Sequence, residues 1–331
     1  MEIPKGAILK SRLWIHRRHL AVVGAVLLLQ SLVGCEAPLN MAGVDSAREN
    51  PIHRTDRYQA IATHGSNVVV VGNQGIIISS PDFGTTWRRV ELSDWPALID
   101  VTVCPDGRFV ALAFAPMIFV SDDSGISWTA RPIPSTENPQ ALTCAPNNRI
   151  WVVGAFTNRW SSTDGGATWL EATDDEDAIL TTVQFFDANS GVITGEFGTV
   201  MTTTNGGETW NRMPALVDEL YPQATYFRDP ETGWIAGLGG VILHTSDGGE
   251  NWVSQETETV VPLYGLEDIA GTVFAVGGEG TLLKLKDNVW RAVNHGKRIR
   301  LYIRAIRALD SARAIIAGVG GTLHIVDIDG A

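Results

Sequence analysis

Short apolar runs of about four to six residues recur from residue 58 to the end of the chain. In the first of the repeating segments they cover residues 58–63, 67–71, 76–80 and 86–90, and Gly, Asn and Asp fill the gaps. Runs of this length, rich in Val and Ile and bounded by turn residues, predict β-strands joined by tight hairpins. Helical periodicity is not convincing anywhere beyond the N-terminal leader. The pattern predicts an all-β protein.

A box of eight residues ending in Trp repeats along the chain. Its copies are Ser80-Pro-Asp82-Phe-Gly84-Thr-Thr-Trp87, Ser121-Asp-Asp123-Ser-Gly125-Ile-Ser-Trp128, Ser162-Thr-Asp164-Gly-Gly166-Ala-Thr-Trp169, Thr203-Thr-Asn205-Gly-Gly207-Glu-Thr-Trp210 and Thr245-Ser-Asp247-Gly-Gly249-Glu-Asn-Trp252. A degraded sixth copy ends at Trp290, and the Trp spacings are 41, 41, 41, 42 and 38. A fixed period near 41 with four short strands per unit is typical of a β-propeller.

A second landmark gives the number of units. A short turn ahead of each box begins at Gly72, Ala113, Gly154, Gly195, Gly237, Gly277 and Gly318. We therefore predict a seven-bladed propeller of four-stranded antiparallel blades over residues 53–331. The chain stops before the outer strand of the seventh unit, so we expect residues about 45–56 to pair there and close the ring.

The residues that recur among the copies of the box have a structural explanation. Asp or Asn at its third position accepts backbone N–H hydrogen bonds across a turn, and Gly at its fifth position permits positive φ. The Trp supplies a large apolar surface for packing. A calcium site needs several oxygen ligands at one place, which one Asp per blade does not provide. We predict no metal and no cofactor.

Residues 1–34 form a separate segment. Five basic residues precede an apolar run, residues 20–34. This run is shorter than the 20 or so residues that are needed to span a bilayer. The run ends Leu32-Val33-Gly34-Cys35, which resembles a bacterial lipoprotein signal with Cys35 as the lipidated residue; an ordinary signal peptide that contains a Cys is the alternative. Either segment is excluded from the fold, and residues 35–52 then form a linker from the anchor. Glu36 follows Cys35, which favours the outer membrane and a periplasm-facing protein.

The charge and the remaining cysteines limit the function further. The net charge is −12 over the whole chain and more negative without the basic leader, so we expect no nucleic-acid partner. Cys104 and Cys144 occupy similar places in successive units. They form either a disulfide, if the compartment is oxidising, or two small buried residues on neighbouring inner strands.

The T-x-[DN]-G-G-x-x-W form, the even spacing and the Gly-x-x-Gly turn resemble the photosystem II assembly and stability factor family of Asp-box (BNR) propellers. The resemblance covers roughly residues 53–331. It implies a seven-bladed, chaperone-like scaffold that binds membrane-protein subunits, and a thylakoid-lumen location if the source is photosynthetic. The family also implies an arginine-rich patch, whereas this chain is acidic and has one basic stretch, from Lys297 through Arg313.

The catalytic set of the sialidases, another Asp-box class, is not matched. Their F/Y-R-I-P motif has only Phe227-Arg228-Asp229-Pro230 as a counterpart, in the fifth unit and with Asp in place of Ile. The acidic run 174–177 is a solvated loop or, less simply, a metal site. We expect a protein that is not an enzyme, with a glycan-active or glycan-binding propeller as the alternative.

Candidate binding residues lie in the segments between units and in the turns at the end opposite the boxes. These segments carry aromatic and arginine side chains, which are typical interface anchors: Trp95, Phe114, Phe156, Tyr221, Tyr264, Arg298 and Arg300. The alternative is that each Phe fills its local core and that the basic residues are ordinary solvated positions. The function predicted is a monomeric, lipid-anchored scaffold that binds a membrane protein complex.

Overall fold

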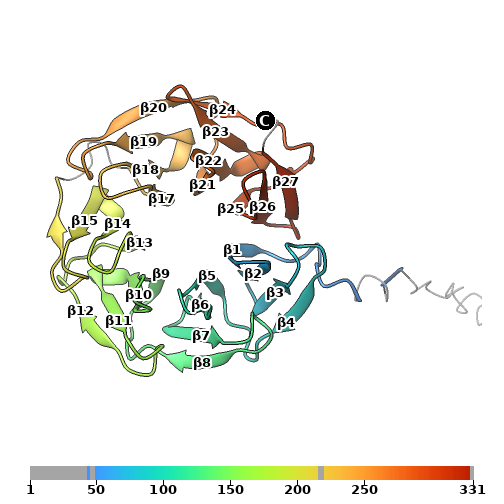
Figure 1. Ribbon diagram of the computed structural model, residues 1–331, viewed down its shortest axis with the longest axis horizontal. Helices are drawn as coiled ribbons and strands as arrows, with labels where there is room; N and C mark the ends of the chain where they lie inside the picture. The colour runs from blue at the N-terminus through green and yellow to red at the C-terminus, as the bar shows by residue number, and fades with distance from the viewer. Residues whose placement is uncertain (1–42, 45–48, 215–219, 329–331) are drawn as a thin grey trace, which may run out of the picture. The chain divides into compact units, whose positions relative to one another are not determined.

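The computed structural model describes residues 43–44, 49–214 and 220–328. The chain divides into two compact units, Met1–Glu49 and Asn50–Ala331, and every strand lies in the second (Figure 1). The leader, Cys35 and most of the linker lie outside the described residues. Within the described part, no helix is long and apolar enough to cross a membrane.

The second unit is an all-β propeller, as predicted. Its strands follow one another in antiparallel groups, which we call blades 1 to 7 in chain order. Blades 1 to 4 are β1 (Tyr58–His64), β2 (Asn67–Gly72), β3 (Ile76–Ser80), β4 (Arg88–Glu91); β5 (Leu98–Val103), β6 (Phe109–Ala113), β7 (Met117–Ser121), β8 (Thr129–Pro132); β9 (Pro139–Cys144), β10 (Ile150–Gly154), β11 (Arg159–Ser162), β12 (Leu170–Ala172); and β13 (Leu180–Phe185), β14 (Gly191–Gly195), β15 (Thr199–Thr203), β16 (Asn211–Arg212).

The later blades follow the same order. They are β17 (Ala224–Phe227), β18 (Gly233–Ala236), β19 (Ile242–Thr245), β20 (Val253–Thr257); β21 (Leu263–Ile269), β22 (Thr272–Gly277), β23 (Leu282–Lys286), β24 (Val289–Ala292); and β25 (Ile303–Ala308), β26 (Arg313–Gly318), β27 (Leu323–Asp327). Blades 5 and 6 join in one eight-stranded sheet because β20 pairs with β24 in parallel over two residue pairs. Four short 3-10 turns, η1 (Ala155–Thr157), η2 (Glu196–Gly198), η3 (Leu238–Gly240) and η4 (Gly278–Gly280), link second and third strands.

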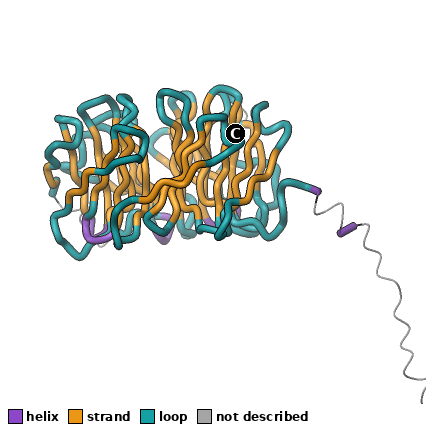
Figure 2. Tube along the Cα trace, turned by 90° about the horizontal axis from the view of Figure 1, so that it is seen from below, coloured by secondary structure: helices purple, strands orange, loops and turns teal. Residues whose placement is uncertain are grey.

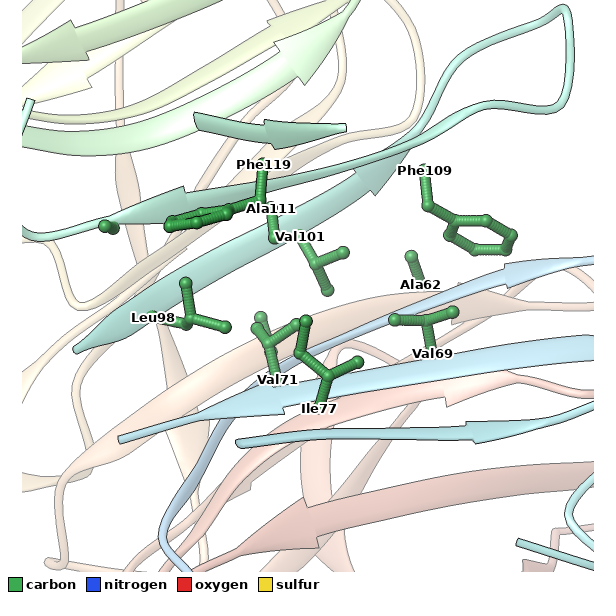
Figure 3. Close-up of a cluster of buried hydrophobic side chains, with 11 residues drawn as sticks. Ala62, Val69, Val71, Ile77, Leu98, Val101, Phe109, Ala111 and Phe119 are labelled. Carbon is green, nitrogen blue, oxygen red and sulfur yellow. The ribbon is translucent and has the colours of Figure 1, made fainter. Parts of the chain in front are cut away.

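The hydrophobic core is divided among the interfaces between blades. Each buried cluster combines residues of two adjacent blades, from blades 1 and 2 through blades 6 and 7, and a further cluster joins blade 7 to blade 1. Second strands such as β6 and β10 are buried at every position because both sheet faces are covered. Figure 3 shows one interface, where Val69, Val71 and Ile77 of blade 1 face Leu98, Val101 and Phe109 of blade 2.

The boxes have the structural role that the sequence predicts. In the third copy, Asp164 Oδ1 accepts hydrogen bonds from the N–H groups of Ala167 (3.0 Å) and Thr168 (2.9 Å), and the Ser162 hydroxyl donates to it (2.8 Å). The Thr168 hydroxyl donates to the other oxygen, Oδ2 (2.6 Å). These hydrogen bonds lower the pKa of the Asp164 carboxyl, and the one from the Thr168 hydroxyl has the largest effect. The box Trp packs against the preceding blade, as Trp210 does against Trp151 (ring centroids 5.9 Å apart). The boxes therefore fix both a hairpin and an interface.

The ring is closed by a clasp on Asp56, which is 1% exposed. Its carboxylate accepts hydrogen bonds from Tyr58 Oη (2.8 Å), Arg89 Nη1 (2.9 Å) and the His53 N–H (2.8 Å). The Asp56 carbonyl in turn accepts from the Gly321 N–H (3.0 Å), in the turn between β26 and β27. Asp56 thus links the first blade to the last through polar contacts beside a shared apolar cluster.

The ring-closing strand predicted for residues about 45–56 is not formed over the described residues 49–56; residues 45–48 lie outside the described residues, and for them the pairing stays a prediction. The sheet of blade 7 has three strands in the described part of the chain, β25-β26-β27. The segment runs instead past the β26–β27 turn, where Arg57 forms a single bridge with Val319. The polar contacts of Asp56 hold it there, in place of a backbone ladder along β27.

The two cysteines form a disulfide. Cys104 directly follows β5 and Cys144 ends β9, the inner strands of blades 2 and 3, and their Cα atoms are 5.0 Å apart. Of the two alternatives that the sequence leaves open, the structure has the bridge.

Candidate functional site

The propeller has two different faces. One, which we call the box face, carries the box hairpins beside the turns between first and second strands; for example, the Gly206 N–H donates to the Asn189 carbonyl (2.7 Å). The other, the turn face, carries the turns between second and third strands and the loops between blades. Figure 2 shows the 3-10 turns along one side of the ring only. This arrangement agrees with the sequence prediction.

A channel of about 390 Å³ runs along the inner strands of all the blades. Its wall is polar, with residues from β1, β5, β9, β13, β17, β21 and β25. On β25, the residues from Arg304 to Arg307 line the channel, and the buried residues Ile303 and Ile306 belong to the cluster between blades 6 and 7. The strands that begin at the turn face therefore place their early residues at the mouth of the channel on that face.

Arg304 lies at this mouth, among tyrosines. Its guanidinium carbon is 5.5 Å from the ring centroid of Tyr264, and the Tyr264 and Tyr302 centroids are 5.4 Å apart. Its one hydrogen bond in the described part of the chain goes from Nη1 to the Tyr264 carbonyl (3.4 Å). Burial lowers the pKa of Arg304, whereas the charge of Asp100 and the nearby tyrosines act to raise it. Arg304 is held on an aromatic face and forms no ion pair with a carboxylate of the described residues, and such a cation is suited to bind an anionic group.

Tyr221 extends this cluster. It is 39% exposed, and burial of the rest of the ring raises its pKa, with the charge of Glu196 in the same direction and that of Arg304 against it. Glu196 sits in η2 and accepts a hydrogen bond from the Ile179 N–H (2.9 Å). The predicted residues Tyr221 and Tyr264 are therefore brought together, around an arginine that the prediction did not select.

Deeper in the channel the charges are paired. Arg307 forms an ion pair with Glu267 and donates from Nε to the Ile61 carbonyl (3.1 Å). Asp100 accepts from the N–H groups of Val101 (2.8 Å) and Leu142 (2.9 Å), and burial raises its pKa to about 6. These groups connect strands around the ring, so we assign them a structural role.

The basic stretch of the sequence does not form one surface. Arg298 and Arg300 are exposed in the loop before β25, as predicted, whereas Arg304 and Arg307 face the channel. Arg313 pairs with Asp310. The stretch runs through a loop, β25 and the start of β26, so its arginines lie on different parts of the molecule.

The predicted aromatic anchors lie on the turn face and are exposed. Trp95 is 74% exposed, Phe114 46% and Phe156 47%, so the alternative that each Phe fills its local core is wrong. Phe197, which the sequence analysis did not select, is 73% exposed at the position that corresponds to Phe156 in the next blade. Gly195 and Gly198 give its turn the same Gly-x-x-Gly pattern as the turns without an aromatic residue, so the sequence pattern does not set Phe197 apart.

A second cavity lies on the turn face between blades 7 and 1. Its volume is about 470 Å³, and Arg54, Arg57 and Leu301 are part of its wall.

The acidic run of the sequence forms ion pairs. Asp174 forms a two-pronged pair with buried Arg159 (2.7 Å for each contact), and Glu176 contacts Arg212 (2.5 Å). Among the described residues, no group of three or more His, Cys, Asp or Glu is placed to hold a metal.

Comparison with known proteins agrees with this architecture. Residues 173–265, which run through blades 4 and 5, match the family model of photosynthesis system II assembly factor YCF48. The solved structure of YCF48 bound to D1 peptide is 18% identical with a TM-score of 0.66, covering 85% of this chain and 96% of that one. YCF48 from Cyanidioschyzon merolae is 17% identical with a TM-score of 0.69, covering 84% and 97%. No curated protein sequence matches the chain.

Enzymes with a similar fold are also found. A catalytically inactive virginiamycin B lyase from Staphylococcus aureus with Quinupristin, in which a histidine is replaced by alanine, is 13% identical with a TM-score of 0.71. It covers 83% of this chain and 96% of that one. At such identities the likeness to solved structures concerns the fold alone. With the family model, it makes the chain an Asp-box (BNR) repeat propeller that resembles YCF48.

Proposed function

We propose that this protein is a non-catalytic, lipid-anchored scaffold that binds a segment of a membrane protein complex on its turn face. The observation that carries the proposal is the mouth of the channel, where Arg304 lies beside Tyr264 and near Tyr302 and Tyr221, with its one hydrogen bond among the described residues to a backbone carbonyl. Aromatic and arginine side chains at the centre of a surface are the usual anchors of a protein interface. YCF48, which the chain resembles, has been solved with a bound peptide.

The anchor is Cys35, which places the propeller at a membrane without a spanning helix. We infer export to the periplasmic side, with the outer membrane favoured by Glu36, or to the thylakoid lumen in a photosynthetic source. The Cys104–Cys144 disulfide supports export, because disulfides persist in oxidising compartments. The protein acts as a monomer with no cofactor.

A glycan-active or glycan-binding propeller is the second candidate. The polar wall of the channel favours it. Against it, the sequence does not match the catalytic set of the sialidases. A glycan array and a sialidase assay on the purified protein decide between the two, since the scaffold predicts no glycan binding and no turnover.

The test is affinity purification of the protein from cells after chemical crosslinking, followed by mass spectrometry. The expected result is one dominant membrane-protein partner, which is lost in the Arg304→Ala and Tyr221→Ala variants. Arg88→Ala, which removes an exposed arginine on outer strand β4, is the matched control and retains the partner. Equal recovery from all the variants would assign binding to another surface, and melting curves of each variant show that the fold is kept.

A further inference from the structure

Three aromatic residues on the turn face have left-handed backbone conformations. The φ angles are 47° at Trp95, 54° at Phe156 and 56° at Phe197, in a region where the Cβ of an L-residue is crowded and where bulky side chains are rare. We call these three residues the aromatic tips. Each is exposed, by 74%, 47% and 73%.

The fold does not need aromatic side chains at these positions. Blades 5 and 7 have Gly239 and Gly320 at the place of Phe156 and Phe197, with φ of 66° and 76°. A Cβ at Gly239 would meet no atom within 4 Å, so this place in the turn is open to solvent. Blades 1 and 6 have Gln74 and Glu279 at the same place, with φ of 62° and 54°, so the turn sets the backbone angle and leaves the choice of side chain free.

The tips and their neighbours form an array on one side of the ring. Phe156 and Phe197 sit at equivalent positions of successive blades, and Phe114 (46% exposed) and Leu238 (52%) lie in the corresponding turns of the blades on either side. Trp95 lies in the loop next to them, since the Gly75 N–H donates to the Pro96 carbonyl (2.6 Å) and the Phe114 N–H to the Ala97 carbonyl (2.8 Å). Figure 2 shows the turns with 3-10 geometry at one level along the edge of the ring. On the box face, Phe83 also has a left-handed backbone, with φ of 56°, and is 37% exposed, and Ile126 of the next box is 47% exposed.

We propose that the aromatic tips insert into the interfacial zone of a zwitterionic lipid bilayer. Separate exposed tips fit a flat, deformable apolar phase, whereas a peptide needs a continuous groove, and none of the three lines the two cavities described above. Trp and Phe are the residues that settle at the boundary of headgroups and acyl chains. Asp94 precedes Trp95 and Glu196 precedes Phe197, so an anionic surface is disfavoured.

The course of the N-terminal segment agrees with this orientation. Residues 53–57 lie against the turn of Gly320 and Gly321, on the turn face. Some 15 residues separate Asn50 from Cys35, a reach of roughly 50 Å at most. A lipid on Cys35, which belongs to the proposed function, would keep the propeller within this distance of the membrane surface, and the tips would add an apolar contact to the bilayer.

The test uses the chain from Glu36 onward without lipid, which keeps the whole compact unit Asn50–Ala331, and sedimentation with phosphatidylcholine vesicles. The expected result is binding of the wild type, at least a tenfold lower partition coefficient for F156G/F197G, and a several-fold higher one for Gly239→Phe. Leu170→Ala removes an apolar side chain that is 68% exposed on outer strand β12 and is the matched control, with unchanged binding. Because Gly accepts positive φ, the melting temperature of F156G/F197G should not fall, which separates lost binding from lost fold.

Three results would overturn the proposal. They are absence of wild-type binding to phosphatidylcholine, equal binding by F156G/F197G, and binding that requires anionic lipid. If vesicles are not bound but F156G/F197G loses the membrane-protein partner in the crosslinking experiment, the tips belong to the protein interface. Arg304→Ala should leave vesicle binding unchanged, so failure here and failure of the proposed scaffold function are separate results.

Discussion

Removal of the disulfide is a direct perturbation of the ring. Cys104 and Cys144 join the ends of the inner strands of blades 2 and 3, with a sequence separation of 40. Cys104 is 1% exposed, so replacement of both residues by alanine keeps the site apolar. The double variant Cys104→Ala/Cys144→Ala therefore removes the covalent link and little else.

The magnitude follows from the length of the closed loop. In the chain-entropy account, a disulfide that closes about 40 residues restricts the unfolded chain by about 4 kcal/mol at 25 °C. The two cysteines are on adjacent blades that already pack through a shared apolar cluster, so the native state changes little on removal. We expect the free energy of unfolding of the double variant to be lower by about 3–4 kcal/mol.

The assay is urea unfolding followed by tryptophan fluorescence, with and without a thiol reductant. The reduced wild type should unfold at the same urea concentration as the double variant, and reductant should not affect the variant. Equal unfolding midpoints for the oxidised wild type and the variant would refute the reasoning, because they would mean that the link constrains no part of the unfolded chain.

Other contacts of the structure give further expectations. Asp56→Ala leaves the Arg89 guanidinium and the Tyr58 hydroxyl without their buried partner and should lower the free energy of unfolding by about 3 kcal/mol; a loss below about 1 kcal/mol in urea unfolding would contradict the clasp. Phe109→Ala, at a fully buried site between blades 1 and 2, should lower it by about 3–5 kcal/mol, with Leu170→Ala near zero as the control. Burial raises the pKa of Asp100 to about 6, so the folded state binds a proton there that the unfolded state releases, and the stability contributed falls as pH rises from about 4 to 6. Asp100→Asn should remove this slope from pH-dependent melting curves, and an unchanged slope would assign it to other groups.

The propeller could be predicted because its signals are local. The hydrogen bonds of each box run between residues at most four apart, as between Ser162, Asp164 and Thr168, so the sequence spacing records the geometry directly. The Gly-x-x-Gly turns are visible for the same reason. Two such landmarks with one period determine the architecture without knowledge of the packing between blades.

The clasp could not be predicted because its partners are distant in sequence. Asp56 contacts Arg89 and Gly321, and nothing in its local sequence marks it as buried. The missing outer strand suggested a backbone ladder along β27, but side-chain hydrogen bonds and an apolar cluster hold the N-terminal segment at the turn instead.

The candidate site was predicted in part. Tyr221 and Tyr264 were selected as aromatic residues in or beside loops, and both lie close enough to Arg304 to affect its pKa. Arg304 was read as part of a basic stretch, because its place in the channel follows only from the closure of the ring, which brings the inner strands of all the blades together. Phe197 was missed because its strain is a backbone angle, which the sequence Gly-Glu-Phe-Gly does not display.

Site-specific photocrosslinking in intact cells tests the central claim, that the turn face binds a membrane protein. A photoreactive residue at Tyr264, at the channel mouth, is compared with one at Thr85, which is exposed in a box on the opposite face. The account predicts a crosslink from position 264 to one dominant membrane protein and none from position 85. The same products from both positions, or no membrane protein from position 264, would contradict it.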